Sequence, residues 1–104
     1  RSLQQLHLSQ TLITDQGLEQ LTELSALTGL WLYDTQISDS GLPHLRGLTA
    51  LCTLHLGRTR ITDAGVVHLK ELTNLRYLAL GKTQISDACA ADLRIVLPDC
   101  TISH

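Results

Sequence analysis

The sequence predicts a right-handed α/β solenoid, in which a coil made of one strand and one short helix is repeated along an axis. The first reason is a segment that recurs four times, beginning at Thr11, Thr35, Thr59 and Thr83, so that the period is 24 residues throughout. The second reason is that apolar spacing changes within each repeat from that of a strand to that of a helix. A fixed period in this range is typical of repeat architectures, in which each unit buries its apolar face against the next.

The first half of each repeat has the spacing of a strand. Each repeat opens L-x-x-L-x-L, and the last two leucines alternate with a residue that points to the opposite face. The leucines are Leu3, Leu6, Leu8; Leu27, Leu30, Leu32; Leu51, Leu54, Leu56; and Leu75, Leu78, Leu80. A Thr follows in each repeat, and two residues later an Ile, at Ile13, Ile37, Ile61 and Ile85.

The second half of each repeat has the spacing of a helix. Apolar residues there recur every three residues, which is typical of a helical stripe. The stripes are Leu18, Leu21, Leu24; Leu42, Leu45, Leu48; Val66, Leu69, Leu72; and Ala90, Leu93, Val96. A hydroxyl residue followed by Asp precedes each stripe, at Thr14, Ser38, Thr62 and Ser86. Either residue could cap the helix; we expect the hydroxyl to do so, with Asp favouring the positive end of the helix dipole.

Two further columns of equivalent residues carry expectations about packing. Strands of one direction joined by helices must be parallel, so equivalent residues of successive repeats lie side by side. We expect the Thr column that begins at Thr11 to bridge backbone groups of adjacent coils. We expect Gly17, Gly41 and Gly65 to mark places where coils approach closely, with Cys89 filling a different gap in the fourth repeat.

The chain is predicted to be a single domain, 1–104, with repeats 3–26, 27–50, 51–74 and 75–98 and a C-terminal cap, 99–104. Pro98, the last residue of the fourth repeat, is expected to end the last helix, and Ile102 in the cap falls in register with Leu78. The chain begins at Arg1, inside a repeat and without Met, which we interpret as the mark of a fragment. The first coil has no comparable cover, so its edge could pair with preceding repeats or with another copy of the chain.

The repeat pattern LxxLxLxxTxITDxGLxxLxxLxx resembles the leucine-rich repeat family, and the resemblance covers essentially the whole chain. Thr stands where the common form of the family has Asn or Cys. The Thr form followed by ITDxGL resembles bacterial leucine-rich repeats, especially those of planctomycetes, and is similar to ribonuclease-inhibitor-like and F-box-associated repeats. The resemblance implies a horseshoe arc with strands on its concave face. By analogy alone, it also suggests the substrate-recognition arm of a ligase-like or effector protein.

Composition excludes several classes of function. The formal net charge is −2, which gives no bulk attraction to nucleic acid or to a membrane surface. No run of about 18 apolar residues is present to span a membrane. The three cysteines, Cys52, Cys89 and Cys100, have spacings that fit neither a metal site nor a disulfide framework. Unpaired cysteines favour a reducing compartment such as the cytoplasm. We expect no cofactor.

The aromatic residues indicate a binding surface. Trp31, Tyr33 and Tyr77 all fall on outward strand positions, and the predicted core contains no aromatic residue. Exposed aromatic side chains with polar neighbours are typical of binding hot spots. We therefore predict that a protein or peptide binds the concave sheet, with Trp31 as anchor and Tyr33 and Tyr77 beside it. The polar surround is His7, His55, Arg58 and Lys82. The alternative is that aromatic residues simply have high strand propensity and fill shallow spaces between coils.

Charge is sorted along the same face. The strand and turn segments of repeats two to four carry Arg58, Arg60, Arg76 and Lys82 against Asp34. This sorting predicts a partner that is acidic, while ordinary solvated charges are the alternative. Asp34 and Arg58 are equivalent positions on neighbouring strands and could pair with each other.

Catalysis and metal binding are not predicted. His7 and His55 share a column, but two strand spacings hold them roughly 9–10 Å apart, too far for one metal ion. His44 and His68 share a helix position, where solvated histidines are the ordinary case. The residue types of a hydrolase triad fall near one another at Ser9, His7 and Asp34. We do not predict catalysis there, because an open curved sheet cannot exclude water. The predicted function is therefore a non-enzymatic binding module; the alternative is a structural segment that caps the C-terminal end of a longer solenoid.

Overall fold

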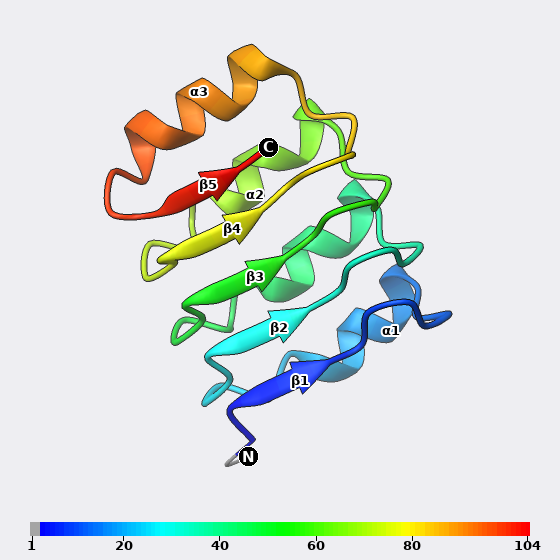
Figure 1. Ribbon diagram of the computed structural model, residues 1–104. Helices are drawn as coiled ribbons and strands as arrows, with labels where there is room; N and C mark the ends of the chain where they lie inside the picture. Colours follow the sequence, from blue (N-terminus) through cyan, green and yellow to red (C-terminus); the bar gives the residue numbers. More distant parts are fainter. Residues whose placement is uncertain (1–2) are drawn as a thin grey trace.

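The computed structural model describes residues 3–104 as one continuous solenoid with a single parallel sheet. Its five strands stand in sequence order along the sheet, so each new coil adds one strand at the same edge. The strands are β1 (Gln5–His7), β2 (Gly29–Trp31), β3 (Thr53–His55), β4 (Tyr77–Ala79) and β5 (Thr101–Ser103). Figure 1 shows them stacked from the N-terminus to the C-terminus, with the helices on one side of the sheet and the connections coiling in the right-handed sense. The predicted fold class is confirmed.

The strands pair in the register that the repeat period of the sequence predicts. Leu6, Leu30 and Leu54 lie side by side on β1, β2 and β3, and each strand pairs with its neighbour at residues 24 positions apart. The same spacing places Leu78 beside Ile102, as predicted. Equivalent residues therefore form straight columns across the sheet, which is what an uninterrupted period requires.

The helical side of the coil is less regular than the strand side. It contains α1 (Asp15–Leu18) with η1 (Glu19–Leu21), η2 (Asp39–Leu45), η3 (Asp63–Gly65) with α2 (Val66–Leu69), and α3 (Asp87–Val96). The second repeat is 3₁₀-helical throughout, and the first and third each combine a 3₁₀ turn with one α-helical turn. An apolar spacing of three residues favours 3₁₀ geometry, because it matches three residues per turn. The fourth is an α-helix that buries Ala90 and Leu93, and its C-capping residue Leu97 is buried as well. The predicted apolar stripe is wrong at Val96, which is 44 % exposed; the capping residue Leu97, where the chain leaves the helix, is buried in its place.

Leucine fills the interior between the sheet and the helices. The side chains of Leu30 and Leu54 are fully buried, and no aromatic residue belongs to the core of the described residues. Burial decreases toward the first coil, where Leu6, Leu8 and Ile13 are only half-buried. The core is thus built mainly by contacts between successive coils, and the first coil has such a contact on one side.

The Thr column does not bridge adjacent coils, and that prediction is wrong. The hydroxyls of Thr35 and Thr59 donate to Leu32 O at 2.8 Å and Leu56 O at 2.7 Å, each within its own repeat. Each hydroxyl therefore closes the turn that ends its own strand. The strand ends are bridged instead by backbone, as when the Arg58 N–H donates to Gly81 O at 2.9 Å.

The aspartates join the coils on the helical side. Asp39 accepts the Thr62 N–H at 2.8 Å and the Thr62 hydroxyl at 2.5 Å, and Asp15 accepts the same two groups of Ser38. The Ser86 N–H donates to Asp63 at 2.7 Å, and this bond is the main reason that the pKa of Asp63 is lowered. We call this set, Asp15, Asp39 and Asp63 with their partners, the aspartate ladder.

The hydroxyl residues are the N-caps by backbone conformation, as predicted, but only some of them cap through the side chain. Thr62 accepts from Ala64 N–H and Ser86 from Cys89 N–H, whereas the side chains of Thr14 and Ser38 make no capping bond.

The prediction that glycines mark close approaches of coils is confirmed for Gly41 and Gly65, where a Cβ atom would overlap the aspartate of the preceding coil. At Gly17 the crowding atom belongs to Ile13 of the same repeat.

The last strand, β5, lies next to β4 at one edge of the sheet. Ile102 on β5 is buried, and the His104 ring lies 2.6 Å from Ile85 O and 3.1 Å from Asp87 Oδ1. His104 thus occupies the place at Asp87 that a hydroxyl residue occupies at the earlier steps of the aspartate ladder. No helix among residues 3–104 is long and apolar enough to cross a membrane.

Candidate functional site

Trp31 lies on the concave sheet and packs against the first strand. The register sets Trp31 between His7 and His55, and its ring stacks on that of His7 with centroids 4.2 Å apart and planes 10° apart. The ring also lies over Gly29, where an added Cβ atom would come within 2.5 Å of it. Trp31 is half-buried by these contacts, so it forms a flat, fixed platform.

Tyr33 and His55 form a second aromatic pair one coil further on. Their rings meet edge to face with centroids 5.1 Å apart, and the Arg58 guanidinium donates to the Tyr33 hydroxyl at 3.4 Å. Burial lowers the pKa of His55. The Gly57 N–H donates to Nδ1 of His55 at 3.3 Å, so that nitrogen carries no proton. His55 therefore presents a neutral imidazole to the concave surface at neutral pH.

A small cavity opens beside this second pair. It has a volume of about 220 Å³, and we call it the concave cavity. Its walls are Tyr33, His55, Gly57, Tyr77, Ala79, Gly81, Lys82 and Ser103. Tyr77 is 38 % exposed, and Ala79 forms part of the buried base. The cavity combines aromatic walls with one cation, Lys82, at its rim.

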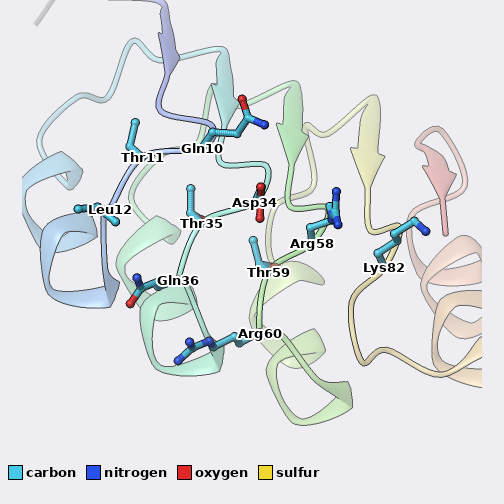
Figure 2. A pocket seen from close by; sticks show the side chains of 10 residues that line it. All are labelled: Gln10, Thr11, Leu12, Asp34, Thr35, Gln36, Arg58, Thr59, Arg60 and Lys82. Carbon is cyan, nitrogen blue, oxygen red and sulfur yellow. The ribbon is translucent and has the colours of Figure 1, made fainter.

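A larger groove of about 660 Å³ runs along the ends of the strands, where each chain segment turns toward its helix. We call it the turn groove. Figure 2 shows its ten lining residues as three rows. Gln10, Asp34, Arg58 and Lys82 form one row, Thr11, Thr35 and Thr59 the middle row, and Leu12, Gln36 and Arg60 the other. Lys82 lines both the turn groove and the concave cavity, so the two hollows are neighbours.

The turn groove is predominantly basic. Arg58, Arg60 and Lys82 stand there against one carboxylate, Asp34, in a chain whose net charge is −2. Among residues 3–104, no ion pair joins Asp34 to Arg58, so the predicted pairing is not formed. Arg58 bonds to Tyr33 instead, and that bond is the main reason that the pKa of Arg58 is raised, with the field of Asp34 contributing less.

The structure distributes the seven predicted site residues over one continuous surface in two groups. Tyr33, Tyr77, His55 and Lys82 line the concave cavity, with Arg58 bonded to Tyr33 at its side. Trp31 and His7 form a separate stacked pair toward the N-terminal edge. The aromatic residues are thus less exposed than the sequence suggests, because two of the three pack against histidines.

Sequence reasoning missed the backbone conformation of the turn. Gln10, Asp34, Arg58 and Lys82 all have positive φ, between 56° and 61°. Only Asp34 belongs to a residue type that is enriched in this region, so the sequence carries little signal for it. The conformation sets the row of side chains along the wall of the turn groove.

Residues 3–104 contain no group of three His, Cys, Asp or Glu side chains that could hold a metal ion. The Ser9 hydroxyl oxygen accepts the Tyr33 N–H at 3.0 Å, a bond between the segments that follow strands β1 and β2. Cys52, Cys89 and Cys100 are all free thiols.

Comparison with known proteins identifies the repeat. A family model described as a leucine-rich repeat matches residues 1–21. A leucine-rich repeat protein of Leptospira interrogans is 28 % identical, with a TM-score of 0.76, over 98 % of this chain and 25 % of that one. An internalin C2 of Listeria monocytogenes is 30 % identical, with a TM-score of 0.78, over 97 % of this chain and 42 % of that one.

A third similar structure is the second actin-binding site of leiomodin-1, which is 17 % identical, with a TM-score of 0.71, over 95 % of this chain and 68 % of that one. At this identity, the likeness is evidence of a shared fold only. No curated protein sequence matches this chain. The chain thus spans between a quarter and a half of the length of its two bacterial neighbours. The resemblance to bacterial repeats agrees with those neighbours, while the narrower resemblance to planctomycete proteins stays a prediction.

Proposed function

Since the chain is a leucine-rich repeat solenoid, we propose that it is a non-catalytic module that binds a protein or peptide on its concave sheet. The single observation that carries the proposal is the placement of the aromatic residues. Trp31, Tyr33 and Tyr77 lie on the concave surface, while the core of the described residues is aliphatic. Rigid aromatic platforms on an open surface are the kind of contact that dominates binding energies in protein interfaces.

The second aromatic pair supports a partner with an apolar side chain. Tyr33, His55 and Tyr77 surround the concave cavity, which at about 220 Å³ is large enough for one side chain but not for a drug-sized ligand. The neutral imidazole of His55 adds no charge to this cavity at neutral pH. A side chain of the partner would therefore enter an uncharged, aromatic recess whose rim carries Lys82.

A non-catalytic role is supported by the openness of the surface. Catalysis needs a nucleophile, a base and a water-excluding site held together. The concave cavity is open, and among the described residues no hydrogen bond joins its hydroxyl, that of Ser103, to its imidazole, that of His55. A binding function accounts for the same residues and requires no catalytic step.

Replacement of Trp31 tests the proposal. Trp31→Ala should lower the affinity for the partner by about tenfold or more, because it removes the largest platform on the concave face. The measurement is a titration of the partner, isolated by affinity capture from the source cells, against both proteins. Urea unfolding should show a midpoint close to that of the parent, since the ring is half-buried on the surface rather than in the core.

Val67→Ala is the matched control, because Val67 is 57 % exposed on the helical side. It should change neither affinity nor midpoint. Equal affinity of the parent and Trp31→Ala for the partner would contradict the proposal.

A second candidate function is that of a structural segment capping a longer solenoid. Two observations favour it: the chain spans 25 % and 42 % of its two bacterial neighbours, and burial declines at the first coil. The isolated chain would then aggregate or self-associate through the open edge of β1 and bind no partner. A folded monomer with partner affinity would instead support the first candidate.

A further inference from the structure

The turns that follow strands β1 to β4 require a positive φ, but most of the residue types found there are not the ones that this conformation favours. Gln10, Asp34, Arg58 and Lys82 occupy the left-handed region, which disfavours residues with a Cβ atom and which glycine adopts without strain. Four coils nevertheless carry long or charged side chains there. Strained conformations that persist in this way are a recognised mark of function, because the side chain is needed at that place.

Three of the cations that the fold leaves without a carboxylate line the turn groove. Elsewhere in residues 3–104, Arg46 pairs with Glu71 and Lys70 with Asp92, both at 2.8 Å. Within the same range, Arg58, Arg60 and Lys82 form no ion pair. Arg76 and Arg94 form none either, but their guanidinium groups donate to backbone oxygens, those of Leu75 and Ile102. The basic side chains that remain free for a ligand are therefore concentrated in one groove, and Figure 2 shows them on both of its walls.

The floor of the turn groove offers a ligand few additional donors. The hydroxyl protons of Thr35 and Thr59 are already donated to Leu32 O and Leu56 O. Charged and amide side chains on the walls must then supply the donors to any ligand. Such a groove favours a ligand rich in negatively charged acceptors.

The shape of the groove favours a linear ligand. Its lining comes from four successive turns, and adjacent strands are roughly 4.8 Å apart, so the lining extends for about 14 Å. An extended peptide covers that length with about four or five residues. The chain's overall charge of −2 opposes a polyphosphate such as nucleic acid, whereas a short peptide meets mainly the local field.

We propose that the turn groove binds an extended acidic segment of a protein partner, with its carboxylates held by Arg58, Arg60 and Lys82. Lys82 is shared with the concave cavity, so an apolar residue next to the acidic segment can enter between Tyr33 and Tyr77. This inference rests on the proposed binding function and names the chemistry of its partner.

The test uses glycine at the strained positions. The double variant Arg58→Gly/Lys82→Gly removes two cations and relieves two positive-φ residues, so its urea midpoint should equal or exceed that of the parent. Gln10→Gly is the uncharged control. Its urea midpoint shows how much glycine at a positive-φ position changes the stability of the protein. Loss of binding in the double variant therefore cannot be attributed to unfolding.

The probe is a dye-labelled synthetic peptide of about eight residues that alternates Glu and Leu, long enough to span the groove. A second peptide has Gln in place of Glu. Fluorescence anisotropy should show the Glu peptide binding the parent at least about tenfold more tightly than the Gln peptide, with the preference falling as salt rises. The double variant should lose the preference. Arg46→Gln/Lys70→Gln, which removes the same charge on the helical side, should keep it.

Three results would overturn the inference: no preference of the parent for the Glu peptide, an unchanged preference in the double variant, or complete displacement of the peptide by inorganic phosphate at the peptide's own concentration. The last result would identify a small-anion site. The Trp31→Ala titration separates the two proposals. If the partner binds the parent, is weakened by Trp31→Ala and is indifferent to the double variant, the concave-sheet function stands and the turn-groove inference fails.

Discussion

At the scale of single residues, Thr35 and Thr59 show how one hydroxyl fixes a turn. They are the two buried polar side chains among residues 3–104, each 6 % exposed. Each donates to the carbonyl three residues earlier, so a carbonyl at the end of a strand has its partner inside the same coil. The repeat therefore requires a small donor at this position, and Thr meets the requirement with a methyl group that tolerates burial.

Replacing Thr59 with Val should destabilise the protein by about 1–3 kcal/mol, because the Leu56 carbonyl would be left buried without a donor. Urea unfolding measures the change. Thr11→Val is the matched control: its hydroxyl makes the same bond, to Leu8 O at 2.6 Å, but on an exposed residue where water can replace it. Equal shifts of the midpoint in the two variants would contradict the assignment.

At the scale of elements, the aspartate ladder connects the helical sides of successive coils. Asp39 reaches from one coil to the backbone and hydroxyl of Thr62 in the next, and Gly65 leaves the space that the carboxylate occupies. The short 3₁₀ and α segments make few internal hydrogen bonds. Bonds between coils therefore determine where each segment begins, more than intrinsic helix propensity does.

Gly65→Ala should destabilise the protein by about 1–3 kcal/mol, although alanine is the better helix former. The added Cβ atom would overlap the Asp39 carboxylate, which is held by Thr62, and would come within 2.9 Å of Leu42 Cδ1. Thermal or urea unfolding measures the effect.

Gly47→Ala is the control, because an added Cβ atom there meets only Thr22 O at 3.5 Å. This change should leave stability the same or slightly higher. If Gly65→Ala were more stable than the parent, the coils could move apart without a loss of stability, and this explanation would be wrong.

At the scale of the whole molecule, stability is distributed along the axis. Each coil contacts only its neighbours, so a coil between two others is held on both sides. Leu30 and Leu54 are fully buried, whereas Leu6 and Leu8 in the first coil are half-buried. Trp31 therefore stacks against a coil, that of His7, whose leucines are less buried than those of the following coils.

Hydrogen exchange should reveal this gradient. The amides of Leu8 and Leu56 make equivalent bonds, both at 2.8 Å, to Trp31 O and Ala79 O. The Leu8 amide should nevertheless exchange at least about tenfold faster, because opening the first coil exposes less buried surface. Two-dimensional NMR in deuterated buffer reads both amides. Equal protection would mean that the solenoid opens only as one cooperative unit.

The sequence by itself determined the coil. Its period places Leu6, Leu30 and Leu54 side by side, and the same rule carries Trp31 and Tyr33 to the concave face. The inference succeeds because a solenoid is nearly one-dimensional, so that a sequence period translates directly into register. The division into a single domain with four repeats and a cap stays a prediction from the same period.

Only the tertiary structure decided the rest. The exposure of Val96, the bond from Asp39 to Thr62 and the stack of Trp31 on His7 all depend on how side chains of neighbouring coils share space. The turn groove depends further on a positive φ at Arg58 and Lys82, residue types that give no local signal for it. Periodicity specifies which residues are neighbours, whereas packing and hydrogen bonding between those neighbours determine their conformation.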